Sequence, residues 1–200
     1  MTAATHAVPV VQTFDRPKKA IRRLRWAWPL AIVVGFPIGG YVANVVVGEI
    51  DSVGAALAGG LIAGAIIGAA QWLALRPLRP GHWLVATSVG TAAGLTAGAA
   101  LVDYGVSRGD LLLMGAVTGL GVGALQALLL ARRVPGAWWW ALANPPAWAL
   151  AWLVTSFVIT RNVKEQFAVF GASGALVFAL LTWLLLTFLF RANERKARGG

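Results

Sequence analysis

Residues 64–75 read GAIIGAAQWLAL, and residues 119–130 read GLGVGALQALLL. The two stretches share key residues at a fixed offset of 55 positions, as these pairs show: Gly64 and Gly119, Gly68 and Gly123, Gln71 and Gln126. The same offset continues through the turn that follows, where PGHW at 80–83 becomes PGAW at 135–138. A repeat of this length indicates one supersecondary unit copied in tandem.

The repeat extends into both flanks. Subtracting 55 from Trp83 gives Trp28, and adding 55 to Gly119 gives Gly174. A span that starts near a tryptophan therefore alternates three times with a span rich in glycine and leucine. The third glycine-rich span has diverged, because Leu181 stands where a third glutamine is expected.

Long apolar stretches decide the environment of the chain. Hydrophobic residues make up 58% of it and charged residues 12%, about half the usual charged share of soluble domains. Each stretch is long enough to cross the hydrocarbon core of a bilayer as a helix. The expected spans are 26–47, 53–75, 82–102, 111–131, 138–159 and 167–190. We predict an all-α integral membrane bundle over 26–190, built from three tandem two-helix repeats of 55 residues. A disordered basic segment at 1–25 and a basic tail at 191–200 flank it.

Basic residues predict the orientation. The chain has 17 Lys and Arg residues, and all but Arg108, Arg161 and Lys164 fall in the two terminal segments or in the second and fourth connections. Because basic loops stay in the cytoplasm, we expect both termini to be cytoplasmic and the chain to lie in the cytoplasmic (inner) membrane. The net charge of +10 is thus a signal of topology. The basic residues are scattered over helix ends without a binding module, so no nucleic-acid partner is expected.

Small residues and tryptophans suggest how the helices pack. Glycines spaced four apart place a close-packing stripe on single helix faces, and small residues let helices approach in lipid. The predicted packing glycines are Gly64, Gly68, Gly90, Gly94, Gly119 and Gly123. Tryptophans at the ends of spans are expected to anchor the bundle at the membrane interface. These are Trp26, Trp28, Trp83, Trp138, Trp139 and Trp140.

A polar layer is expected inside the bundle. Gln71 and Gln126 each follow a stripe glycine by seven residues, so both share its helix face. The other candidates for the layer are Thr87, Ser88, Thr91 and Asn144. Two interpretations remain open: structural hydrogen bonding between helices, or a layer that binds a ligand.

The sequence lacks the residues that several kinds of chemistry require. The chain has no cysteine, and its two histidines, His6 and His82, are far apart in the sequence. No carboxylate interrupts a predicted span, and no nucleophile with a partner base stands out. We therefore expect no catalytic, cofactor or metal site, and we expect that the protein is not an enzyme. The carboxylates of the non-cytoplasmic loops are interpreted as solvated loop charges.

The repeated glycine, glutamine and leucine pattern with its Pro-Gly-x-Trp turn resembles small multi-pass membrane proteins of bacteria, a group that implies no particular activity. Two hypotheses for function follow. The first is a non-catalytic accessory or structural component that packs with the lipid bilayer, with a membrane protein partner or with further copies of itself. The second is a binding or transport protein for a small uncharged or hydrophobic solute. Since each repeat unit would start and end in the cytoplasm, the repeats are parallel, which is not the inverted arrangement of many transporters.

Overall fold

The computed structural model describes residues 15–76, 82–132, 134–158 and 165–199, and over these residues the chain forms six α-helices. Each helix contains a segment long and apolar enough to cross a membrane. The helices are α1 (Asp15–Val47), α2 (Val53–Leu75), α3 (Trp83–Leu101), α4 (Arg108–Ala131), α5 (Trp138–Val158) and α6 (Ala172–Gly199). The prediction of an all-helical bundle with six potential membrane spans is confirmed.

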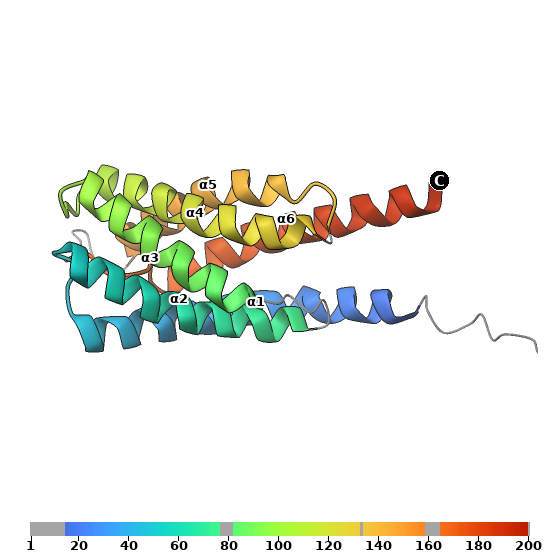
Figure 1. The fold of residues 1–200 in the computed structure, drawn as a ribbon, viewed down its shortest axis with the longest axis horizontal. Coiled ribbons are helices and arrows are strands. Elements are labelled where there is room, and N and C mark those ends of the chain that lie inside the picture. The colour runs from blue at the N-terminus through green and yellow to red at the C-terminus, as the bar shows by residue number, and fades with distance from the viewer. Residues whose placement is uncertain (1–14, 77–81, 133, 159–164, 200) are drawn as a thin grey trace, which may run out of the picture.

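The helices form a closed ring. Each helix packs against its neighbours in the sequence, and α6 packs against α1. The first residues of α1 and the last residues of α6 project from the same end of the bundle (Figure 1). We call this the terminal end, to which the α2–α3 and α4–α5 connections also belong, and we call the other the opposite end.

The first and last helices are longer than the expected spans. Helix α1 begins at Asp15, so that residues 15–25, expected to be disordered, continue the helix beyond the bundle. Helix α6 likewise runs through the basic tail to Gly199. Residues 1–14 of the expected N-terminal segment lie outside the described residues.

The segment before α6 is non-helical and buried. The expected span at 167–190 begins as a helix only at Ala172. Gln166 and Phe170 are nevertheless almost fully buried, and the backbone N–H of Ile50 donates to the carbonyl oxygen of Gln166 over 3.0 Å. Non-helical backbone is tolerated at membrane depth when protein surrounds it. The apolar residues 167–170 therefore fold into the opposite end of the ring instead of extending α6.

A capping box sets the start of α4. The side-chain oxygen of Ser107 accepts a hydrogen bond from the backbone N–H of Asp110, whose carboxylate accepts one from the backbone N–H of Ser107. This arrangement satisfies backbone donors at the helix N-terminus. It explains why α4 begins at Arg108, before the expected start at 111.

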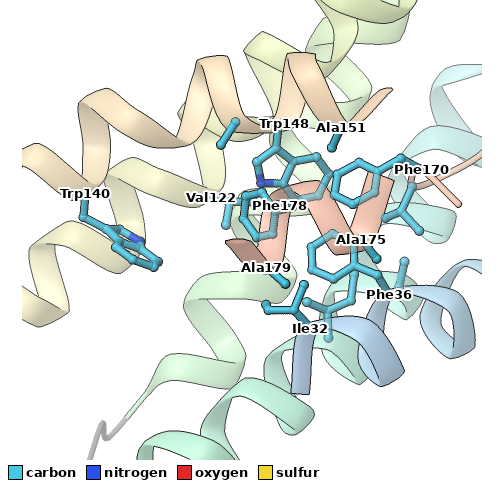
Figure 2. Packing of buried hydrophobic residues seen from close by; sticks show 14 of the residues in the cluster. Ile32, Phe36, Val122, Trp140, Trp148, Ala151, Phe170, Ala175, Phe178 and Ala179 are labelled. Atoms are coloured by element: carbon cyan, nitrogen blue, oxygen red, sulfur yellow. The ribbon is translucent and has the colours of Figure 1, made fainter. Parts of the chain in front are cut away.

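Aromatic rings fill the half of the ring nearer the opposite end. Phe36 and Phe170 stack with centroids 4.6 Å apart, and Trp148 meets Phe170 edge-on at 5.1 Å (Figure 2). Phe178 of α6 contacts all three of these rings. Aromatic pairs in these geometries stabilise the fold by more than the burial of their apolar area alone. We call these four residues the aromatic plug.

Glycines bring the backbones of adjacent helices into contact. A Cβ atom on Gly64 of α2 would lie 2.7 Å from the Cα atom of Ser88 in α3, and one on Gly94 of α3 would lie 2.6 Å from the Cα atom of Thr118 in α4. Such separations are too short for any side chain, so only glycine allows this approach. The other predicted packing glycines face the same neighbours at comparable range: Gly68 faces α3, Gly90 faces α4, and Gly119 and Gly123 face α5.

Candidate functional site

Three tryptophans meet at the centre of the ring, in its half nearer the terminal end. They come from α1, α3 and α5, and each is at most 1% exposed. The centroid of the Trp28 ring lies 6.3 Å from that of Trp83 and 5.6 Å from that of Trp140, and the last two are 6.4 Å apart. We call these three residues the tryptophan cluster.

Each indole of the cluster donates a hydrogen bond to the helix that precedes its own in the ring. Trp83 of α3 donates from Nε1 to Gln71 Oε1 of α2 over 2.9 Å. Trp140 of α5 donates to Gln126 Oε1 of α4, also over 2.9 Å. Trp28 of α1 donates to the hydroxyl of Thr182 in α6 over 3.0 Å. We call the contact between two neighbouring helices of the ring a seam. The same kind of hydrogen bond therefore crosses three seams, including the one between α6 and α1.

The two glutamines also bind each other. Gln126 Nε2 donates to Gln71 Oε1 over 3.0 Å and to the hydroxyl oxygen of Thr87 over 2.9 Å. The Thr87 hydroxyl in turn donates to the carbonyl oxygen of Trp83 over 2.9 Å. We call Gln71, Thr87 and Gln126 the amide layer. All three are at most 2% exposed, so they form a buried network in which the donors and acceptors named here are engaged by protein groups.

The other candidates for the polar layer bind backbone carbonyls. Thr91 donates to the carbonyl of Thr87 over 2.7 Å, and Asn144 Nδ2 donates to that of Trp140 over 2.8 Å. Ser88 donates across the α2–α3 seam to the carbonyl of Leu61 over 2.8 Å. These three hydrogen bonds therefore lie beside the amide layer and do not involve the glutamines.

The prediction of interfacial anchoring was wrong for the tryptophan cluster. Trp26 is 81% exposed, and Trp138 and Trp139 are about half exposed, which fits a position at the interface. Trp28, Trp83 and Trp140 are buried instead, because their ring N–H groups bind partners inside the bundle. One sequence signal could have indicated this burial: each of the three tryptophans has a polar residue as a possible partner on the neighbouring helix. Thr182 was missed because a glutamine was expected at that level of the sixth span.

The contacts of α5 also differ from an uninterrupted 55-residue register. Gly68 faces Leu84, 16 positions further along the chain, whereas Gly123 faces Ala141, 18 positions further along. Two more residues thus separate the contacting positions of α4 and α5 than separate those of α2 and α3. As a result Trp140, and not Trp138, takes the place in the tryptophan cluster that corresponds to Trp83.

Two buried polar atoms of α5 have no hydrogen-bond partner among the residues that the structure describes. They are Asn144 Oδ1 and Trp148 Nε1, on residues that are fully buried. Residues four apart lie on one face of a helix, so the acceptor and the donor occupy successive turns of α5. Asn144 follows Trp140 of the tryptophan cluster by one turn, and Trp148 belongs to the aromatic plug.

At the opposite end, carboxylates approach one another on the loops. The negative charge of Glu165, together with some desolvation and a hydrogen bond to Glu165, raises the pKa of Glu49, and Asp51 adds a smaller effect in the same direction. Among the described residues, no group of three or more His, Asp or Glu side chains is arranged to hold a metal ion.

Comparisons with known proteins give no relative: no family model, no curated protein and no solved structure matches this chain. The site must therefore be interpreted from its own geometry.

Proposed function

We propose that the protein is a non-catalytic, multi-pass membrane protein that acts as an accessory or structural component, packing with lipid or with a membrane partner. The observation that carries this proposal is the amide layer at the centre of the ring. Gln71 Oε1 and Gln126 Oε1 already accept hydrogen bonds from Trp83 and Trp140, and the Gln126 amide is held by Gln71 and Thr87. These polar groups of the amide layer are thus already bound to other groups of the protein.

The outer surface supports the same proposal. Large apolar side chains are exposed on all six helices, for example Tyr41, Leu73, Val85, Leu120, Leu142 and Phe188. In a membrane these side chains face lipid tails or the apolar surface of another membrane protein. We infer that the terminal end faces the cytoplasm and that the chain resides in the inner membrane, because basic residues concentrate at that end.

We also infer that the ring arose from three copies of one two-helix unit. The support is the hydrogen bond between two glutamines that lie 55 positions apart and the recurrence of the indole bond at alternate seams. The two-residue shift of α5 counts as an insertion in the third copy.

A second candidate function is the binding or transport of a small uncharged or hydrophobic solute. It is favoured by one observation, the unpartnered Asn144 Oδ1 and Trp148 Nε1 inside the ring. A small solute with one donor and one acceptor would satisfy both atoms.

Native purification followed by mass spectrometry separates the two functions. An accessory component should retain lipids or a membrane protein, and no discrete polar solute. A solute retained at one copy per chain, and lost in an Asn144→Ala variant that still folds, would overturn the accessory role. The variant Ser88→Ala is a suitable control, because Ser88 binds a carbonyl at a different seam.

A further inference from the structure

We propose that a groove between α1 and α6 at the terminal end binds the phosphate headgroup of an anionic membrane lipid. The groove has a volume of about 180 Å³ and lies where the two helices leave the ring. The proposal deepens the accessory role proposed above, because it names the class of lipid and the place where it binds.

Arginines from both helices stand at this groove. Arg25 of α1 and Arg191 of α6 are exposed residues that contribute to its lining. Among the described residues, no acidic side chain lines it. Two guanidinium groups on separate helices match the oxygens of a phosphate, which accepts paired hydrogen bonds from arginine.

A tryptophan with an unpaired ring N–H also lines the groove. It is Trp183, whose Nε1 atom is buried and has no hydrogen-bond partner among the described residues. Leaving such a donor unpaired is costly, and a headgroup oxygen would remove that cost once the indole turns its N–H toward the groove. Trp28 lines the groove as well, but its own ring N–H already binds Thr182. Of these two tryptophans, Trp183 is thus the one with the unpaired donor.

The depth of the groove fits a lipid headgroup. The apolar segments of the two helices are Arg23–Val47 and Ala172–Ala192, so that Arg25 and Arg191 lie at the ends of the potential spans. Basic residues in this position reach the headgroup region of a bilayer.

Apolar surface continues from the groove toward the membrane. Leu186 and Phe190 line it beside the arginines. A second groove of about 270 Å³ shares Thr187 and Arg191 and includes Leu184 and Phe188, which are half exposed on the outer face of α6. Because apolar surface leads outward from the arginines, the groove fits a phospholipid with its acyl chains better than a free anion.

The α1–α6 seam can be open here because it lacks close-packing glycines at the terminal end. Over residues 180–190, α6 has only leucines, phenylalanines, threonines and one tryptophan, whereas α2 and α4 contain several glycines. Side chains therefore hold this seam apart, whereas backbones touch at the α2–α3 and α4–α5 seams.

Native mass spectrometry of the full chain in nonionic detergent tests the proposal. The probes are phosphatidylglycerol and phosphatidylcholine with identical acyl chains, because only the second carries a choline cation that the arginines would repel. We expect phosphatidylglycerol to bind at least about tenfold more tightly, the effect of one charge-assisted hydrogen bond or more. Equal binding of the two lipids would overturn the site and leave the accessory role standing. A transported solute would overturn that role and leave the lipid preference untouched.

Matched variants test whether the two arginines of the groove cause the preference for phosphatidylglycerol. The double variant Arg25→Gln with Arg191→Gln should lose the preference, whereas Arg76→Gln with Arg132→Gln, which removes the same charge from the same end, should keep it. Equal losses in both variants would mean general surface attraction and would overturn the groove. Trp183→Phe, which keeps an aromatic ring but removes the N–H, should weaken phosphatidylglycerol binding several-fold. Inorganic phosphate alone should neither bind nor compete at millimolar concentration; saturable competition would identify a free anion as the ligand instead.

Discussion

Gln126 donates its amide N–H to the side-chain oxygen of Gln71 over 3.0 Å, although 55 residues separate them in the chain. The same oxygen accepts the indole N–H of Trp83, and the other oxygen of the pair accepts that of Trp140. Two amides thus bind two tryptophans and join α2, α3, α4 and α5 at one level. The bond explains why a polar residue recurs at this position of an otherwise apolar sequence.

Replacing either glutamine should weaken the bundle without changing its fold. Gln126→Leu leaves the Trp140 N–H unpaired and removes two further hydrogen bonds, so we expect a loss of about 1–2 kcal/mol in unfolding free energy. Gln71→Leu should act similarly. Thermal or denaturant unfolding in detergent measures both, with Leu128→Gln on the lipid-facing surface as a polarity control. If either glutamine variant bound partner lipids or solutes differently while its stability stayed unchanged, the layer would be a binding site and not a structural one.

Tryptophan to phenylalanine substitutions should separate the buried cluster from the interface. Trp140→Phe removes a buried donor from Gln126 and leaves a small void, so its melting temperature should fall clearly. Trp138→Phe changes a side chain that is 55% exposed and should have little effect. The drop in melting temperature for Trp28→Phe should lie between those of the other two variants, because the Thr182 hydroxyl keeps its own bond to the carbonyl of Phe178. Equal effects at positions 138 and 140 would contradict the two-residue shift in α5.

A methyl group at a seam glycine should force two helices apart. Gly94→Ala places Cβ at 2.6 Å from the Cα atom of Thr118, so overpacking of about 1–3 kcal/mol is expected. Gly54→Ala is the matched control, since nothing lies within 4 Å of its Cβ position. Alanine there should be neutral or slightly stabilising, because it restricts the unfolded chain. Similar losses in the two variants would count against backbone contact at the α3–α4 seam.

The orientation can be tested with single cysteines, because the chain has none of its own. A cysteine at Ser107, on the opposite end, should react with an impermeant maleimide added outside intact cells. A cysteine at Arg132, on the terminal end, should react only after the cells are opened. The reverse pattern would place the basic loops outside and would contradict a cytoplasmic terminal end.

Glu49 should titrate at a higher pH than an ordinary glutamate. The raised pKa comes mainly from the charge of Glu165, so Glu165→Gln should lower it toward the usual value. Because protonation of Glu49 relieves this repulsion, the loop contact gains stability as the pH falls through that pKa and loses it as the pH rises. Carboxyl-carbon NMR of the labelled protein follows the titration, and an unchanged midpoint in the variant would show that Glu165 is not the cause.

The sequence was sufficient to predict the six helices because each span lacks interior charge and fills a bilayer's thickness. It also predicted which glycines and glutamines lie inside, since residues three, four and seven apart share a helix face. It did not predict the partners of the tryptophans. A tryptophan near the start of a span fits an interfacial position and a buried one equally well, and Trp28 binds a residue 154 positions away. The buried stretch before Ala172 was missed because apolar residues outside a helix look the same as residues inside one.

The seam between α1 and α6 has a consequence for how the protein is made. Helix α1 is synthesised before α6, so the bond between Trp28 and Thr182 can form only after α6 has been made. Until then the growing chain has five helices with an open flank, and the aromatic plug lacks both Phe170 and Phe178. The ring can therefore close only after α6 has been made, and a chain truncated before residue 165 would leave the flanks of α1 and α5 without their partner.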